Sequence, residues 1–124
     1  MNNHRPKNLN ILTIRFPIPA IVSILHRISG VILFLLIPIF LWGLKLSLAS
    51  QQDFDSLKEF LSTPVMKFIV WCFLSAFIYH FVAGIRHLLM DLHIGEELKS
   101  GRIMSVLTMI VSILFIIMTG VWLW

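Results

Sequence analysis

Hydrophobic residues fill three long stretches of this chain, and charged residues lie before these stretches, between them and at their edges. No Asp, Glu, Lys or Arg lies between Arg27 and Lys45, between Lys67 and Arg86, or after Arg102. Together with its flanks, each stretch approaches or exceeds the ~20 apolar residues that cross ~30 Å of hydrocarbon as a helix. Because backbone groups in lipid must bond one another, each stretch is predicted to be helical. The pattern therefore predicts an all-α integral membrane protein with three transmembrane helices.

The three predicted helices divide the chain into simple parts. The predicted spans cover residues 21–48, 65–89 and 103–124. Residues 1–20 are expected to form an arm before the first span. There is no internal repeat, so the whole chain, 1–124, is predicted to be a single membrane-anchor domain.

Prolines mark where the first two helices begin and bend. Pro17 and Pro19 precede the first span, and Pro38 lies inside it and should bend that helix. Thr63 and Pro64 suit the start of the second helix. A hydroxyl favours the cap position, and proline favours the first helical position.

Composition agrees with a membrane protein and limits the chemistry available. Of the 124 residues, 58% are hydrophobic and 13% are charged, whereas soluble domains carry about 25% charged residues. The single cysteine, Cys72, excludes an internal disulfide and a CxxC redox pair, and it is expected to pack as a small apolar residue. The chain has no GxGxxG, no phosphate loop and no carboxylate cluster with metal spacing. We therefore expect no nucleic-acid partner, and any chemistry must come from a cofactor or a partner chain.

The distribution of charge predicts the orientation in the membrane. The N-terminal arm carries three basic residues and no acidic ones, and Lys99 and Arg102 lie between the second and third spans. The loop between the first two spans balances three basic residues with three acidic ones. The positive-inside rule then predicts a cytoplasmic N-terminus and a periplasmic C-terminus. With that orientation all four tryptophans fall toward the outer interface, as expected of an aromatic belt.

Polar side chains lie inside two of the three predicted spans. Ser23, His26 and Arg27 occur early in the first, and His80, Arg86 and His87 occur late in the second. A charged group at membrane depth costs ~2.5–3.5 kcal/mol on insertion scales and usually faces a partner or a ligand. By helical rise, Arg27 lies ~9 Å and His80 ~13 Å from the inner end of its helix. The two groups are thus expected to meet in the inner half of the bilayer and form a site.

In the first span, Ser23, Arg27 and Gly30 are spaced i, i+4, i+7, with His26 one step away. A hydroxyl and a guanidinium on adjacent turns can donate to one carbonyl or carboxylate group. Gly30 leaves space for a close-packed helix or a flat ligand. The spacing equally allows Arg27 to extend to the inner headgroups while Ser23 bonds its own helix backbone.

In the second span, His80, Gly84 and His87 form a stripe at i, i+4, i+7. An imidazole facing a bundle interior is a good ligand for haem iron, and Gly84 would let a porphyrin approach the backbone. His80 and His87 are ~10 Å apart along the axis, so they cannot ligate one iron from opposite faces. A second ligand would come from His26 or from a partner subunit. The alternative to haem ligation is that the histidine is a hydrogen-bonded residue of the bundle interior. Separately, His87 is expected to pair with Asp91.

The third span carries no ionisable residue and is predicted to pack as a wall. Its hydroxyl side chains are expected to donate weakly between helices. They are Ser105, Thr108, Ser112 and Thr119. His4 and His93 lie outside the apolar stretches and are expected to be interfacial.

Two motifs resemble a known family. S-x-x-H-R-x-x-G runs from Ser23 to Gly30, and H-x-x-x-G-x-R-H-x-x-x-D runs from His80 to Asp91. Paired in this way, they resemble the cytochrome b membrane-anchor subunit of succinate dehydrogenase (respiratory complex II). The resemblance covers nearly the whole chain and includes RPKNL at residues 5–9 and TIRFP at residues 13–17.

The resemblance implies a fold, partners and a cofactor. Subunits of this family are three-helix proteins that pair with a second small membrane anchor and dock an iron–sulfur subunit and a flavoprotein subunit on the inner side. A haem b lies between the two anchors. By motif match His80 would be its axial iron ligand from this chain, and the partner anchor would supply the other histidine. His26 and Arg27 would lie near the haem propionates, and Ser23 and Arg27 would line the ubiquinone site.

The implied function is electron transfer from succinate to ubiquinone in the respiratory chain and the tricarboxylic acid cycle. This subunit would not be catalytic alone but would contribute to quinone reduction. The lack of a transit segment favours a bacterial inner membrane. The alternatives are a fumarate reductase anchor and a structural or assembly subunit without cofactor. A proton- or ion-conducting subunit relaying through His80 and His87 is disfavoured, because the outer half offers no continuing polar path.

Overall fold

The computed structural model describes residues 16–124, and these residues are helical apart from short connections. The described part of the chain contains four helices and no strand: α1 (Ile18–Ala49), α2 (Gln51–Leu61), α3 (Pro64–Asp91) and α4 (Leu98–Leu123). Three of them, α1, α3 and α4, are long and apolar enough to cross a membrane. The prediction of an all-α protein with three such helices is confirmed. The basic residues of the arm, His4 and RPKNL lie outside the described residues, as does most of TIRFP.

The long helices extend beyond the predicted spans. Residues 21–48 lie inside α1 and residues 65–89 lie inside α3, while α4 begins five residues before the predicted start at residue 103. Trp124 follows the last residue of α4. The helices contain 32, 28 and 26 residues. At 1.5 Å per residue, each is longer than the ~30 Å hydrocarbon core, so its ends reach the interfaces.

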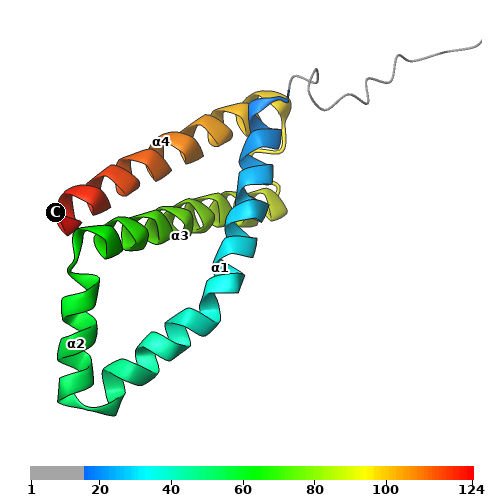
Figure 1. The fold of residues 1–124 in the computed structure, drawn as a ribbon. Helices are drawn as coiled ribbons and strands as arrows, with labels where there is room; N and C mark the ends of the chain where they lie inside the picture. Colours follow the sequence, from blue (N-terminus) through cyan, green and yellow to red (C-terminus); the bar gives the residue numbers. More distant parts are fainter. Residues whose placement is uncertain (1–15) are drawn as a thin grey trace, which may run out of the picture.

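Helix α1 begins after Pro17 and is bent. The carbonyl of Pro17 accepts a hydrogen bond from the Ala20 N–H at 2.9 Å, which forms the first turn. Pro38 lies inside the helix. Proline lacks an N–H donor and its ring crowds the preceding turn, which bends a helix. Figure 1 shows that α1 changes direction along its length, as predicted, and that its second half diverges from α3.

The segment expected to be a loop between the first two spans contains a helix, which corrects that expectation. The Ser50 hydroxyl accepts a hydrogen bond from the Asp53 N–H at 3.0 Å and caps the start of α2. Asp53 in the first turn also favours the positive end of the helix dipole. Phe54 and Phe60 are exposed on α2. Helix α2 therefore joins the C-terminal end of α1 to the N-terminal end of α3 as a short amphipathic element (Figure 1).

Helix α3 starts at Pro64, as predicted, but its cap differs from the expectation. The Thr63 hydroxyl donates to the Phe60 carbonyl at 2.8 Å instead of capping α3. At the other end, Gly95 has φ +84° in the turn to α4. A Cβ there would overlap the sulfur of Met104, so this tight turn requires glycine.

Small residues allow α3 and α4 to pack closely. The buried positions of α4 recur every three or four residues, at Gly101, Ser105, Thr108 and Ser112. The prediction that the hydroxyls of this helix donate between helices is wrong. Those of Ser105, Thr108 and Thr119 donate to carbonyls of the preceding turn of α4. A helix always offers the i−4 carbonyl to such side chains, so the local bond forms first.

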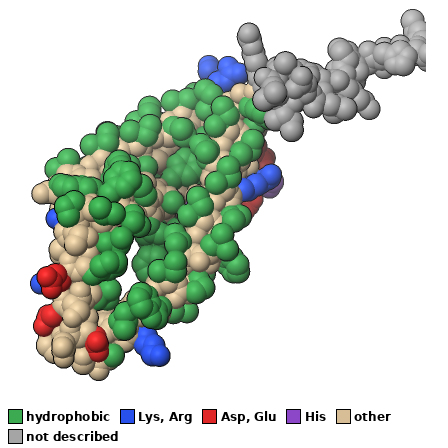
Figure 2. All heavy atoms as spheres, viewed as in Figure 1, with side chains coloured by type: hydrophobic (Ala, Val, Ile, Leu, Met, Phe, Trp, Pro, Cys, Tyr) green, Lys and Arg blue, Asp and Glu red, His purple; other side chains and the backbone are tan. Residues whose placement is uncertain are grey.

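Apolar side chains cover the outside of the molecule. Among the described residues only Val22 and Ala83 are fully buried hydrophobic side chains. Cys72, expected to pack inside, is exposed on α3. Figure 2 shows hydrophobic side chains over most of the visible face and acidic side chains gathered over α2. Such a surface is stable against lipid and partner helices rather than against water.

Candidate functional site

Helices α1 and α3 bring the imidazoles of the two predicted stripes into contact. The rings of His26 and His80 are stacked, with centroids 4.2 Å apart and planes inclined by 15°. The ring of His87, also on α3, lies 4.8 Å from that of His26 and is tilted by 38° to it. The polar groups of the two spans therefore meet at one level, as the helix depths predict.

A closed set of hydrogen bonds fixes the orientation of His80. Its Nδ1 lies 3.1 Å from the His26 carbonyl oxygen and 3.1 Å from the Ser29 hydroxyl. The Ser29 hydroxyl itself donates to the same carbonyl at 2.8 Å. A carbonyl oxygen only accepts, so Nδ1 of His80 carries the hydrogen and donates. In a neutral ring, Nε2 of His80 is then the nitrogen that carries no hydrogen, and this tautomer can bind a metal through Nε2.

Two glycines make room for this contact from opposite sides. A Cβ on Gly30 of α1 would lie 3.0 Å from Cε1 of His80 on α3. A Cβ on Gly84 of α3 would lie 3.6 Å from Nε2 of His26 on α1. Each glycine thus accommodates the imidazole of the facing helix. The space at Gly84, predicted to admit a porphyrin, faces His26.

Two buried nitrogen atoms lack partners in the described part of the chain. They are Nε2 of His26 and Nε of Arg86, and the Arg86 side chain is 4% exposed. Buried polar atoms are normally hydrogen-bonded, and each unpaired one costs about 1–3 kcal/mol. The two nitrogens therefore leave polar capacity unused inside the contact between α1 and α3.

The residues predicted to bind a quinone lie beside this cluster. Arg27 follows His26 in sequence and is exposed, while Ser23 is half-buried. The predicted stripe of Ser23, Arg27 and Gly30 is therefore divided, because Gly30 lies against His80 of α3 and Arg27 is exposed. Arg27 can contact a ligand or another subunit at the level of the histidines.

The charged end of α3 is arranged differently from the expectation. Across residues 16–124 the one ion pair joins His93 to Glu96, at 3.0 Å. His87 and Asp91 do not pair, which corrects that prediction. His87 turns its ring to His26 instead, because its position on α3 faces α1.

Two residues of the site are not singled out by the sequence analysis. Ser29 bonds His80, and the Tyr79 hydroxyl donates to the Val22 carbonyl at 2.9 Å. Ser29 is three residues after His26, so helical spacing could have placed it on the buried face. Tyr79 carries no such signal, because its bond depends on how α1 and α3 cross.

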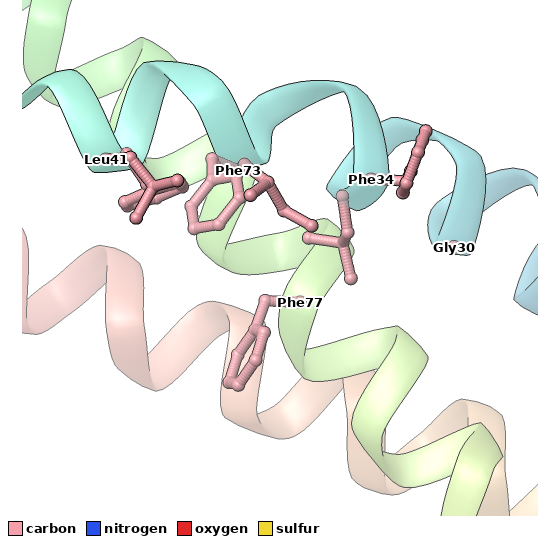
Figure 3. A pocket seen from close by; sticks show the side chains of 8 residues that line it. Gly30, Phe34, Leu41, Phe73 and Phe77 are labelled. Carbon is pink, nitrogen blue, oxygen red and sulfur yellow. The ribbon is translucent and has the colours of Figure 1, made fainter.

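An apolar cavity of about 440 Å³ adjoins the site between α1 and α3 (Figure 3). It begins at Gly30, beside His80, and continues toward the bend of α1. Every residue that lines it is apolar: Gly30, Leu33, Phe34, Ile37, Phe40, Leu41, Phe73 and Phe77. Its character suits a flat hydrophobic group or an apolar segment of a partner.

The stacking of the two rings bears on the alternative in which His26 supplies a second iron ligand. The imidazoles of His26 and His80 are in van der Waals contact, which does not favour that alternative. The described residues also contain no group of three His, Cys, Asp or Glu side chains that could hold a metal ion alone.

Comparison with known proteins gives one consistent result. Residues 1–119 match the family model described as "Succinate dehydrogenase/Fumarate reductase transmembrane subunit". The chain is 43% identical to the succinate dehydrogenase cytochrome b556 subunit of Coxiella burnetii, over the full length of both chains. It is 33% identical to that subunit of Rickettsia prowazekii, over 90% of this chain and 87% of the relative. It is 28% identical to that of Paracoccus denitrificans, over 90% and 95%.

Proposed function

Because the chain belongs to the family of succinate dehydrogenase/fumarate reductase transmembrane subunits, we propose that it binds haem b and forms part of a ubiquinone-reduction site. Its three membrane-spanning helices and its bacterial relatives make it a multi-pass inner-membrane protein. As a succinate dehydrogenase cytochrome b subunit it is a membrane anchor of that complex. Haem ligation, quinone binding and the partners are the proposal.

The observation that carries the proposal is the orientation of His80. Donation from Nδ1 to the His26 carbonyl leaves Nε2 as a lone-pair donor. A hydrogen bond on the far nitrogen of a ligating imidazole fixes its tautomer and raises its basicity. The apolar cavity beside Gly30 supports a macrocycle next to this ligand. When bound, haem b supplies reversible one-electron storage between the two anchors.

The unpaired nitrogens support the same placement. The propionates of a haem are anionic, and the orphaned atoms of His26 and Arg86 are buried donors or potential donors. Exposed Arg27 adds a guanidinium at the same level. We propose that His26 and Arg27 hold the propionates, with Arg86 contributing charge from α3. An anion beside Arg86 would offset the cost of burying its guanidinium charge.

Ser23 and Arg27 are proposed to orient the quinone. Negative charge develops on the carbonyl oxygens of a quinone as it is reduced, and a hydroxyl with a guanidinium donates to that charge. Arg27 is exposed, so it can complete a site between this chain and other subunits. The alternative, in which Arg27 extends only to lipid headgroups, gives it no role in turnover.

The proposed assembly follows from charge and length. The N-terminus is cytoplasmic, which puts the α3–α4 turn on the cytoplasmic side and α2 on the periplasmic side. The iron–sulfur and flavoprotein subunits then dock near Arg27, and a second small anchor covers the apolar flanks of α1 and α3. The whole chain acts as one membrane-anchor domain.

Replacing Arg27 with Leu tests the quinone site. In the purified complex, succinate:ubiquinone reductase activity should fall about 10²-fold, the effect of removing one donor to a developing oxyanion. Reduction of an artificial dye by succinate should persist, because dye takes electrons before the quinone site. Arg102→Leu is the matched control, since Arg102 is also exposed but lies on α4. Undiminished ubiquinone reduction in Arg27→Leu would refute the assignment.

The family description also names fumarate reductase, which is the second candidate. The wild-type complex distinguishes the two when both directions are assayed. A succinate dehydrogenase reduces ubiquinone with succinate faster than it reduces fumarate with a quinol. The reverse ratio would assign the chain to fumarate reduction. A colourless intact complex would instead favour a structural subunit without cofactor.

A further inference from the structure

We propose that Ser29 is a positioning residue that sets the electron donation of the His80 imidazole and thereby the reduction potential of the haem. The inference rests on the proposed function, in which His80 ligates the iron. It adds a residue with no contact to the iron, the porphyrin or the quinone in that proposal. Its basis is the hydrogen-bonded triangle formed by His80 Nδ1, the Ser29 hydroxyl and the His26 carbonyl.

The hydroxyl of Ser29 is itself oriented by the helix. Its hydrogen points to the His26 carbonyl, at 2.8 Å, so its lone pairs are left to face His80 Nδ1, at 3.1 Å. The N–H of His80 is therefore shared between two acceptors. Ser29 is 6% exposed and lies in the contact between α1 and α3. In a low-dielectric interior such polarised bonds are stronger than in water.

Two consequences follow for a ligating imidazole. An acceptor on the distal N–H moves electron density toward Nε2, which favours the oxidised iron and lowers the reduction potential. Two acceptors in different directions also restrict rotation of the ring. Within the described residues, the Ser29 hydroxyl is the one side-chain group that bonds His80. Removing it should raise the potential while leaving the ligand in place.

The test compares Ser29→Ala with Ser47→Ala in the purified complex. Ser47 lies on the same helix and makes the same kind of bond, donating to the Leu44 carbonyl at 2.8 Å. It is about five turns, or ~27 Å, further along α1. The measurements are haem content, the haem midpoint potential from a redox titration, and the EPR spectrum of the oxidised haem. If Ser29 had a purely structural role, its loss would not change the midpoint potential or the EPR spectrum of the haem.

We expect Ser29→Ala to retain haem, to have a raised midpoint potential and to show shifted EPR g-values. Ser29→Thr, which restores a hydroxyl, should return the potential toward that of the wild type, and Ser47→Ala should match the wild type. If Ser29→Ala does not assemble, Ser29→Cys replaces it, because a thiol of similar size is a weak acceptor. The same criterion then applies.

Each outcome decides the matter. A haem-containing Ser29→Ala or Ser29→Cys complex with wild-type potential and EPR overturns the inference and leaves the proposed function standing. A potential that moves equally in Ser47→Ala also overturns it. The proposed function is tested separately by His80→Ala, which removes the ligand itself. If that variant keeps the wild-type haem spectrum, the ligand assignment fails for a reason independent of Ser29.

Discussion

At the scale of single residues, the site depends on how two imidazoles share the space between α1 and α3. His26 provides both a ring that stacks on His80 and a carbonyl that accepts from it. Gly30 provides the space for the second ring. One short segment of α1 therefore determines the tautomer, the orientation and the position of a side chain on α3.

Gly30→Ala tests that dependence. Its Cβ would lie 3.0 Å from Cε1 of His80, so the imidazole must move by a few tenths of an ångström. We expect lower haem content or a shifted haem spectrum in the purified complex. Gly43→Ala on the same helix is the control, because a Cβ there meets nothing within 4 Å. Helix propensity alone would make either change stabilising by about 1 kcal/mol. Wild-type haem content and spectrum in Gly30→Ala would show that His80 is not held by this contact.

The sequence predicts part of this geometry and not the rest. Helical spacing and depth bring His26, Arg27 and His80 to one level, and the structure agrees for the two histidines. The role of Ser29 needs the rotation of each helix about its axis, which is set by packing. The exposure of Arg27 has the same origin, because residues 26 and 27 differ by about 100° around the helix.

At the scale of the elements, the helices are held together by close packing and by few polar bonds. Trp71 on α3 donates its indole N–H to the Ile116 carbonyl on α4, at 3.0 Å. Gly120 leaves space for the same indole, since a Cβ there would lie 3.0 Å from Nε1. This contact fixes the N-terminal part of α3 relative to the C-terminal part of α4.

Trp71→Phe should therefore destabilise the complex. Loss of the hydrogen bond costs about 1 kcal/mol, and loss of packing adds to it. We expect a lower midpoint for thermal inactivation, with the haem spectrum unchanged below that midpoint. Trp122→Phe serves as the control, because Trp122 is 78% exposed. Equal midpoints for the two variants would mean that the indole bond does not hold α3 to α4.

The sequence predicts which helices are present better than it predicts where each helix begins and ends. Long apolar stretches cannot be anything but helices in lipid, so α1, α3 and α4 follow from composition. Helix α2 is amphipathic and short, and its start depends on a local cap at Ser50. Thr63 could bond either its own turn or the next helix, and the structure selects the former. Such choices between local hydrogen bonds are close in energy.

At the scale of the whole molecule, the chain is an incomplete structure without its surroundings. Its large apolar side chains face outward, and its polar cluster contains unpaired buried atoms. Lipid can cover the apolar side chains but cannot form hydrogen bonds with the unpaired polar atoms. In the proposed function, other subunits cover part of this apolar surface and the propionates of a haem partner the unpaired nitrogens.

The proposed orientation can be tested on spheroplasts whose inner membrane is still closed. In a Cys72→Ser background, a cysteine is introduced by Ser56→Cys on α2 or by Glu97→Cys at the α3–α4 turn. Both positions are exposed. A membrane-impermeant thiol reagent added to spheroplasts should label the Ser56→Cys protein and should label Glu97→Cys only after the membrane is opened. The opposite pattern would place the N-terminus outside and move the proposed site to the periplasmic half.

The central claim is that His80 ligates a haem iron through Nε2 while its Nδ1 is held by α1. The most direct measurement is the reduced-minus-oxidised visible spectrum of the purified complex carrying His80→Ala, compared with His93→Ala. His93 is an exposed histidine that pairs with Glu96 and lies outside the cluster. We predict that His80→Ala loses the low-spin haem b spectrum and that His93→Ala keeps it. An unaltered haem b spectrum in His80→Ala would contradict the account.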